Sequence, residues 1–339
     1  MSSRRALLPL TPLYAAALAA KNALYATGIL RPKKLAQPVI SVGNLSTGGS
    51  GKTPFILALS ELLAAAGWQA DVLTRGYGRL NSEIARVDPE GTATQFGDEP
   101  LLLARAGLPV YVGASRYRAG LLAEAQPAAG KQVHLLDDGM QHRKLARQVE
   151  IVLLLKADFD DALLPSGNLR EPLSALHRAD IIVLRAEDSA LESRVRTLLG
   201  PRRNPIFWRV QRSLKLRTLA GEPAAIPQRA LAFCALARPA AFLSSLRDAG
   251  CIPFSLAAAR DHHIYTPRDM QSLAARAISQ NADALITTAK DACKLSPVLL
   301  ATLTNDVPVL VADLITTIHD QPTATAQLLA LLTGNMPSA

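Results

Sequence analysis

The chain has 339 residues, of which 49% are hydrophobic and only 4% aromatic, and its formal net charge is +9. A chain of this length buries a large core and is expected to divide into two domains. A composition poor in aromatic residues favours helices packed on a sheet over an aromatic-rich β-sandwich. The positive charge comes without a nucleic-acid recognition motif or a set of stacking aromatic residues, so we expect no nucleic-acid partner. No feature of the sequence indicates an obligate protein partner.

Residues 1–35 form a basic and largely apolar segment. They contain six basic residues and no acidic one: Arg4, Arg5, Lys21, Arg31, Lys33 and Lys34. A cleaved signal peptide is disfavoured, because no clear small-residue cleavage site follows. The segment is long enough to span a bilayer, but Pro9, Pro12 and Lys21 count against a spanning helix.

An amphipathic helix in the membrane interface fits these residues better. Its Leu, Tyr and Ala side chains would enter the lipid, and its Lys and Arg side chains would meet anionic head groups. The alternative is an Ala-rich helix packed on the protein's own core. The segment therefore predicts a membrane surface as partner and a peripheral or monotopic protein, and it leaves open whether the helix spans the membrane or lies on it.

From residue 36 the chain alternates short apolar runs with amphipathic stretches, which predicts βαβ units and a parallel sheet with helices on both faces. The predicted strands are residues 39–42, 71–74, 110–112, 133–136, 151–155 and 181–184. The predicted helices are residues 54–66, 99–106, 116–124 and 172–177. Residues 36–210 are predicted to form the first α/β domain.

A proline-rich and basic stretch at residues 201–227 breaks the alternation and is expected to link two domains. The alternation then resumes, with predicted strands at residues 231–236, 252–256, 284–287 and 307–311 and predicted helices at 239–249 and 267–280. Residues 228–335 are therefore predicted to form a smaller α/β lobe that closes over an active site between the lobes.

Residues 39–53, with the sequence VISVGNLSTGGSGKT, predict a strand, a Gly-rich loop and the start of a helix. The backbone N–H groups of such a loop and the helix N-terminus bind phosphate. Lys52 can reach the β- and γ-phosphates, and the Thr53 hydroxyl can ligand Mg²⁺. Ser46 stands where the strict pattern has Gly. The predicted nucleotide-binding residues are Ser46, Thr47, Gly48, Gly49, Ser50, Gly51, Lys52 and Thr53. The first domain is thus predicted to be of the P-loop NTPase type.

The predicted strand at residues 133–136 ends in Asp137 and Asp138. In P-loop enzymes such an acid holds Mg²⁺ directly or through water. The two side chains point to opposite faces of an extended strand, so we expect them to differ in role, and which of them touches the metal stays open. Arg170 could neutralise phosphate charge and Glu171 could join the metal shell. A salt bridge at a helix start explains these two residues about as well.

Two further motifs offer groups for proton transfer. Asp98 precedes a predicted helix, and the residues alone favour an N-cap over a proton acceptor for an attacking hydroxyl. The segment Asp261-His262-His263 could be a surface turn or a pair of metal ligands, although no third ligand has a suitable spacing. A His of this segment could also face a first-lobe carboxylate and form an acid–base pair on closure.

Together these segments resemble the tetraacyldisaccharide 4′-kinase family, the lipid A 4′-kinases of Gram-negative bacteria. The matching stretches follow the family order over most of the chain: residues 42–54, 73–79 (LTRGYGR), 97–100 (GDEP), 136–142 (LDDGMQH), 169–176 (LREPLSAL), 261–263 (DHH) and 288–295 (TAKDACKL). Two departures lie in the second lobe. Residues 288–291 read Thr-Ala-Lys-Asp instead of the usual Thr-Glu-Lys-Asp, and residues 234–239 replace a pattern richer in Gly.

The resemblance implies transfer of the γ-phosphate of ATP, with Mg²⁺, to the 4′-hydroxyl of a tetraacylated glucosamine disaccharide 1-phosphate. The product would be lipid IVA, made at the cytoplasmic face of the inner membrane during lipid A biosynthesis. The implied catalytic residues are Asp98 as base, His262 in preference to His263, Lys52 and Arg170. The implied metal-binding residues are Thr53, Asp137, Asp138 and Glu171. The alternative from another class is a P-loop ATPase that acts as a membrane-associated switch or transport-coupling protein.

Overall fold

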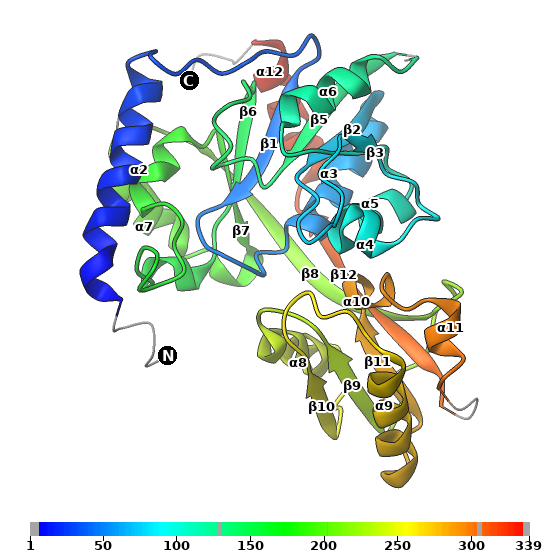
Figure 1. Ribbon diagram of the computed structural model, residues 1–339. Coiled ribbons are helices and arrows are strands. Elements are labelled where there is room, and N and C mark those ends of the chain that lie inside the picture. Colours follow the sequence, from blue (N-terminus) through cyan, green and yellow to red (C-terminus); the bar gives the residue numbers. More distant parts are fainter. Residues whose placement is uncertain (1–6, 128–129, 202, 304–306, 335–339) are drawn as a thin grey trace.

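The computed structural model describes residues 7–127, 130–201, 203–303 and 307–334. Within these residues the strands join into one twelve-stranded sheet, in the order β10-β9-β11-β12-β8-β7-β6-β1-β5-β2-β4-β3. Two lobes share this sheet, and the long strands β8 and β12 run from one lobe to the other (Figure 1). Arg4 and Arg5 of the predicted N-terminal segment, and residue 335 of the predicted second lobe, lie outside the described residues.

The strands are β1 (Val39–Asn44), β2 (Trp68–Thr74), β3 (Ala85–Arg86), β4 (Val110–Val112), β5 (Lys131–Asp137), β6 (Val149–Leu153), β7 (Ile181–Arg185), β8 (Ile206–Thr218), β9 (Ala230–Cys234), β10 (Ser255–Ala258), β11 (Ala284–Thr288) and β12 (Val309–Ile318). The α-helices are α2 (Thr11–Ala26), α3 (Lys52–Ala65), α4 (Ala93–Phe96), α5 (Asp98–Arg105), α6 (Arg116–Glu124), α7 (Leu191–Leu199), α8 (Pro239–Asp248), α9 (Pro267–Ser279), α10 (Ala289–Ala292), α11 (Pro297–Leu300) and α12 (Gln321–Thr333). Short 3-10 helices are η1 (Leu8–Leu10), η2 (Lys156–Phe159), η3 (Leu173–Arg178) and η4 (Ala186–Asp188).

Strand β1 lies at the centre of the first lobe, between β5 and β6 and parallel to both. All of its residues are buried, as expected for a parallel strand that is covered on both faces. Its side chains alternate between the two faces. Ile40 packs in one cluster with Phe55 of α3, and Val39 packs in another with Ala119 of α6. The predicted α/β fold, a largely parallel sheet with helices on both faces, is confirmed.

The second lobe repeats this layered arrangement on a smaller scale. Strands β9, β10 and β11 are parallel, with β9 in the middle. Phe233 of β9 clusters with Met270 of α9, whereas its neighbour Ala232 clusters with Phe242 of α8. The two helices therefore cover opposite faces of these strands.

The connection between the lobes differs from the prediction of a break at residues 201–227. Strand β8 covers Ile206–Thr218, pairs in parallel with β7 and pairs antiparallel with β12 over nine residue pairs, Leu310↔Thr218 to Ile318↔Val210. The polar and basic residues between its apolar positions, among them the exposed Arg209 and Lys215, give the segment the composition of a linker. The connection is thus a hydrogen-bonded strand pair instead of an irregular loop.

The chain returns to the first lobe at helix α12. Ala324 and Leu328 lie four residues apart on this helix, on one face, and pack in the same cluster as Phe55 of α3. The predicted second lobe, residues 228–335, included this helix. Its apolar face covers the first-lobe sheet, so its packing differs from that expectation.

Helix α2 lies along the edge of the first lobe, and none of its residues is buried (Figure 1). The Tyr14 hydroxyl donates to the Arg170 carbonyl at 2.8 Å, and Lys21 Nζ donates to the Gln141 carbonyl at 3.1 Å. Leu13 is 71% exposed. The helix is therefore fixed to the lobe by polar contacts and does not enter the core. Among the described helices, none combines the length and the apolar character that crossing a membrane requires.

Candidate active site

The Gly-rich loop lies at the carboxyl ends of the central strands. Val42 of β1 lies beside Asp137 of β5 in the sheet, so the loop after β1 and the acidic end of β5 are neighbours. The strand order reverses at β1. The chain continues from β1 to β2, which lies beyond β5 on one side, whereas β6 and β7 lie on the other side of β1. Open α/β sheets bind their ligands at such a switch point.

The backbone of residues 45–51 is that of an anion-binding loop. Gly48, Gly49 and Gly51 have φ of +75°, +52° and +80°, a region that glycine adopts without steric cost. Helix α3 begins directly after them, at Lys52, so its N-terminus faces the loop. This arrangement presents N–H groups and the helix dipole to a phosphate.

A second segment holds the start of the loop. Thr47 N donates to the Asn168 carbonyl at 2.8 Å, and Ser46 forms an isolated bridge with Leu169. Ser46 is fully buried and does not have a positive φ. Its departure from the Gly pattern therefore strains nothing in this backbone.

Lys52 and Arg170 meet at one carboxylate. Arg170 donates to both oxygens of Asp138, at 2.6 and 2.8 Å, and Lys52 Nζ lies 3.2 Å from Asp138 Oδ1. Asn44 Oδ1 accepts from both cations, at 3.0 Å from Lys52 and 2.6 Å from Arg170. Burial raises the pKa of Asp138, but the hydrogen bond from Arg170 and the charge of Lys52 outweigh burial and hold this pKa below its ordinary value. Sequence reasoning missed Asn44, whose only local signal is an amide at the end of β1.

Asp137 has a different environment from Asp138, because Asp137 is the last residue of β5 whereas Asp138 lies beyond the strand with φ of +52°. It is 5% exposed, and its Oδ2 accepts from the Thr74 hydroxyl at 2.9 Å. Burial, reinforced by the negative charge of Glu99, raises the pKa of Asp137 to about 6, even though Lys52 opposes the shift. A buried carboxylate with so little compensating charge is suited to a cation. Thr53, the other expected ligand, lies in the first turn of α3.

Glu171, an expected metal ligand, has a charged partner within the protein. Its carboxylate is 1% exposed and forms an ion pair with Arg178, at 2.7 Å. The described residues contain no group of three or more His, Cys, Asp or Glu side chains placed to hold a metal, so Glu171 does not join Asp137 and Asp138 in one cluster. Glu171 thus pairs with Arg178, and Arg170 pairs with Asp138, so the two neighbours do not form the salt bridge with each other that was the alternative.

Asp98 and His262 are brought together from the two lobes. His262 Nδ1 lies 2.9 Å from Asp98 Oδ2, across 164 residues of sequence. The ionised carboxylate only accepts, so the Nδ1–H group donates. Asp98 is 4% exposed, and its Oδ1 accepts from Glu99 N at 2.9 Å. Gly97 is the N-cap of α5, and Asp98 is the first helical residue. The predicted cross-lobe pair is therefore present, with Asp98 one position inside the helix.

The neighbouring histidine has a structural partner instead. His263 Nε2 lies 3.1 Å from Asp269 Oδ2, in the capping box of α9. His262 has φ of +60°, a conformation uncommon for a residue with a Cβ, and its ring lies 5.0 Å from the ring of Tyr77. The geometry thus distinguishes the two histidines: His262 is the partner of Asp98, and His263 is the partner of Asp269.

Two lysines that sequence reasoning missed surround this pair. Lys290 Nζ lies 3.7 Å from Asp98 Oδ2 and 3.3 Å from Glu99 Oε1, and Lys294 Nζ lies 3.6 Å from Asp98 Oδ2. Burial raises the pKa of Asp98, but the His262 hydrogen bond and the two lysine charges lower it further than burial raises it. The net pKa lies below the ordinary value, so Asp98 is ionised at neutral pH. The only signal in the sequence was a pair of lysines four residues apart in the segment of residues 288–295, TAKDACKL.

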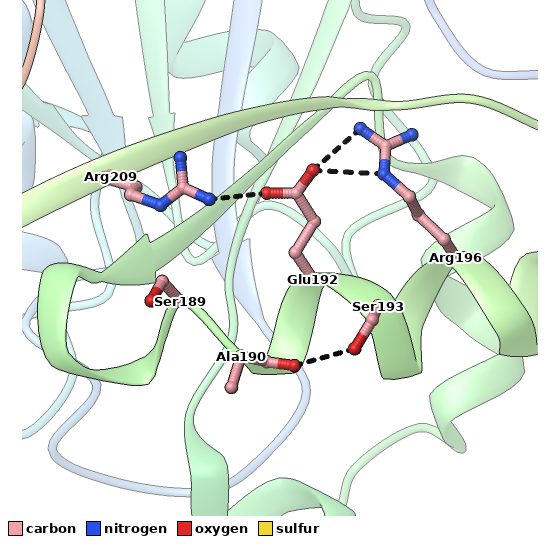
Figure 2. Close-up of a pocket in the computed structure, with 6 residues that line it drawn as sticks. All are labelled: Ser189, Ala190, Glu192, Ser193, Arg196 and Arg209. Carbon is pink, nitrogen blue, oxygen red and sulfur yellow. Dashed lines mark hydrogen bonds and ion pairs between the residues drawn. The ribbon is translucent and has the colours of Figure 1, made fainter.

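A shallow hollow on the surface lies apart from these residues (Figure 2). Its lining residues are Ser189, Ala190, Glu192, Ser193, Arg196 and Arg209. Glu192 forms ion pairs with Arg196 at 2.9 Å and with Arg209 at 2.7 Å. The hollow is therefore braced by ion pairs between its own side chains.

Comparison with known proteins agrees with this geometry. The family model described as tetraacyldisaccharide-1-P 4′-kinase (LpxK) matches residues 3–333. The chain belongs to this family. A tetraacyldisaccharide 4′-kinase of Koribacter versatilis is 44% identical over 295 residues, covering 85% of this chain and 88% of the relative. One from an Anaeromyxobacter species is 40% identical over 307 residues, covering 84% and 81%.

A solved structure gives the same family in three dimensions. The crystal structure of the "apo" form of LpxK from Aquifex aeolicus in complex with ATP matches with a TM-score of 0.76 and 30% identity. The match covers 97% of this chain and 99% of that one. The resemblance noted in the sequence is thus confirmed, and so is the kinase family's fold.

The Asp98–His262 pair leads to a measurable prediction. Because the hydrogen bond from His262 lowers the pKa of Asp98, replacing His262 by Ala is expected to raise that pKa toward or above its ordinary value. The measurement is a ¹³C NMR titration of the Asp98 carboxyl. His263→Ala, which removes the partner of Asp269 instead, is the matched control and is expected to leave the Asp98 pKa unchanged. An Asp98 pKa that does not rise in His262→Ala would contradict the pairing.

Proposed function

We propose that this protein transfers the γ-phosphate of ATP to the 4′-hydroxyl of a tetraacylated glucosamine disaccharide 1-phosphate, forming lipid IVA in lipid A biosynthesis. The observation that carries the proposal is the Asp98–His262 pair, 2.9 Å apart, because it joins the two lobes next to a phosphate-binding loop. The negative charge of Glu99, next to Asp98, raises the pKa of Asp137, which links this pair electrostatically to the acidic end of β5.

The residues divide the work of phosphoryl transfer. Lys52 neutralises charge on the transferring phosphate, and Arg170 holds Asp138 and Asn44 in place around Lys52. Asp98 is ionised and accepts the proton of the attacking sugar hydroxyl. His262 donates through Nδ1 to Asp98, orients that carboxylate and tunes its pKa. Most of the rate enhancement comes from positioning and charge stabilisation, as in other phosphoryl transfers.

The residues present also fit a magnesium ion. Mg²⁺ is commonly held by one or two carboxylates together with substrate phosphates and water, so a preformed cage of three acids is not needed. The Thr53 hydroxyl and the Asp137 carboxylate would hold the ion, since Asp138 is paired with Lys52 and Arg170 and Glu171 with Arg178. When bound, Mg²⁺ supplies positive charge at the β- and γ-phosphates.

Helix α2 suits attachment to the cytoplasmic face of the inner membrane. It exposes leucines and is flanked by basic residues at 31, 33 and 34. Its polar contacts to Arg170 and Gln141 place it beside the loops that follow the catalytic strand ends. An acylated substrate could therefore keep its chains in the bilayer while its sugar reaches Asp98.

Replacing Asp98 by Asn tests the proposed base. We expect kcat for phosphate transfer to the lipid disaccharide to fall by roughly 10²- to 10⁴-fold, the usual contribution of a general base, with the KM for ATP changed by only a few-fold. The exposed Asp88→Asn variant is the control. The same assay without lipid addresses the alternative function, because ATP hydrolysis that is independent of lipid would support a switch ATPase and not a kinase.

Replacing Leu13 by Glu tests the membrane contact of α2. Leu13 is 71% exposed, so the substitution is expected to leave the fold intact. It should weaken binding to anionic phospholipid vesicles by roughly 10- to 100-fold, since burial of a leucine contributes about 1.5–3 kcal/mol. Val298→Glu, which places the same charge on the equally exposed helix α11, is the matched control. Equal vesicle binding by both variants would argue against α2 as the docking element.

A further inference from the structure

Arg212 interrupts the apolar side of strand β8. Trp208, Val210 and Leu216 are buried at alternate positions of the strand, and Arg212 occupies the same set of positions. Its side chain is therefore directed to the covered face of the sheet, where Trp208 and Val210 pack with residues of α3. A guanidinium at such a position requires a polar or anionic partner.

The other two arginines of β8, Arg209 and Arg217, have carboxylate partners. Arg209 forms an ion pair with Glu192 at 2.7 Å (Figure 2), and Arg217 pairs with Asp313 at 2.5 Å. No carboxylate of the described residues lies within ion-pair distance of Arg212. Burial and the like charge of Arg185 lower the pKa of Arg212 to about 10, although the more distant carboxylates of Glu187 and Asp188 oppose the shift. Its positive charge is thus poorly compensated within the protein.

The partner that Arg212 does have is the Gly-rich loop. Its Nη2 donates to the carbonyl of Ser50. The guanidinium also packs so closely on Gly51 that any Cβ at that position would collide with it. Gly51 directly precedes Lys52, so the guanidinium of Arg212 lies against the part of the loop that turns into α3.

Buried polar atoms without partners gather around this contact. Arg212 Nε and Ser50 Oγ have no hydrogen-bond partner among the described residues. Thr316 faces Arg212 across the β8–β12 pair, and its Oγ1 also lacks one. Buried groups of this kind are nearly always satisfied in native proteins. An anion with several oxygens would supply acceptors where the protein supplies none.

We propose that Arg212 is a phosphate-binding residue of the nucleotide site, contributed by the strand that connects the lobes. In the ligand-free protein its guanidinium rests on the Ser50 carbonyl, and in the complex the β- and γ-phosphate oxygens of a nucleoside triphosphate become its partners. A guanidinium can bind such oxygens through two parallel hydrogen bonds. The inference rests on the proposed function in one respect, that the loop binds ATP. It adds a cation that lies 160 residues beyond Lys52 in the sequence.

Binding and unfolding measurements on the full chain test this assignment. For Arg212→Gln we expect the Kd for Mg-ATP to rise by roughly 10- to 100-fold, the range for loss of a hydrogen bond to a charged group. The rise in Tm caused by inorganic tripolyphosphate should shrink in parallel. The Tm of the ligand-free variant should not fall, since the change removes a poorly compensated buried charge. Arg212→Lys keeps the charge but loses the planar fork, and should weaken Mg-ATP binding several-fold.

Arg209→Gln is the matched control, on the same strand and with its own carboxylate partner, and it should bind Mg-ATP as the wild type does. A folded Arg212→Gln with a Kd within about twofold of wild type would overturn the proposal, because it lies far below the expected range. A lowered ligand-free Tm with unchanged affinity would also overturn it and would make Arg212 a structural brace. If Arg212→Gln does not fold, wild-type affinity in Arg212→Lys decides against the proposal.

A parallel assay of wild-type phosphate transfer to the lipid separates this inference from the proposed function. Nucleotide binding that depends on Arg212 without transfer to the lipid would retain the inference and refute the kinase activity. Normal transfer with binding that is insensitive to Arg212 would refute the inference alone.

Discussion

The hydrogen bond between His262 and Asp98 joins two lobes, and its partners are 164 residues apart in the sequence. It therefore depends on how the two lobes are positioned relative to each other. Strands β8 and β12 provide that position, since they continue the sheet of the first lobe into the second. Lys290 adds a second cross-lobe contact, 3.3 Å from Glu99. In the proposed mechanism this acid–base pair is complete only when both lobes are in register, which would couple proton acceptance to the arrangement that holds the substrates.

Charge organises the other half of the site. Lys52 and Arg170 share one carboxylate, Asp138, and two guanidiniums from the second half of the chain reach the loop: Arg212 at Ser50 and Arg238 at the Thr47 carbonyl, 3.4 Å away. The surplus of positive charge is suited to a polyphosphate, whose binding relieves the repulsion among these cations. Asp137 is the exception, because its buried and weakly compensated carboxylate favours a cation.

Local patterns in the sequence predicted the parts of the molecule that depend on neighbouring residues. The Gly-rich loop, the strand that ends in Asp137 and most helices follow from periodicity and turn chemistry. Contacts between distant segments were not accessible in this way. An Asp at a helix start looks the same whether it caps or accepts a proton, and only His262 distinguishes the two. Strand β8 was missed because its basic residues and the prolines around it have the composition of a linker. The placement of Arg212 was missed with it. The ion pair of Glu171 with Arg178 was likewise not predicted.

In the proposed mechanism, Asp98 and His262 act as one unit in phosphate transfer. A double-mutant cycle on kcat/KM measures this directly, with Asp98→Asn, His262→Ala and the double variant assayed on the lipid disaccharide. Residues that act as a unit are strongly non-additive, so the double variant should be little slower than Asp98→Asn alone. If the two losses instead multiply, the residues contribute independently, and the cross-lobe pair is not the proton-accepting device of this protein.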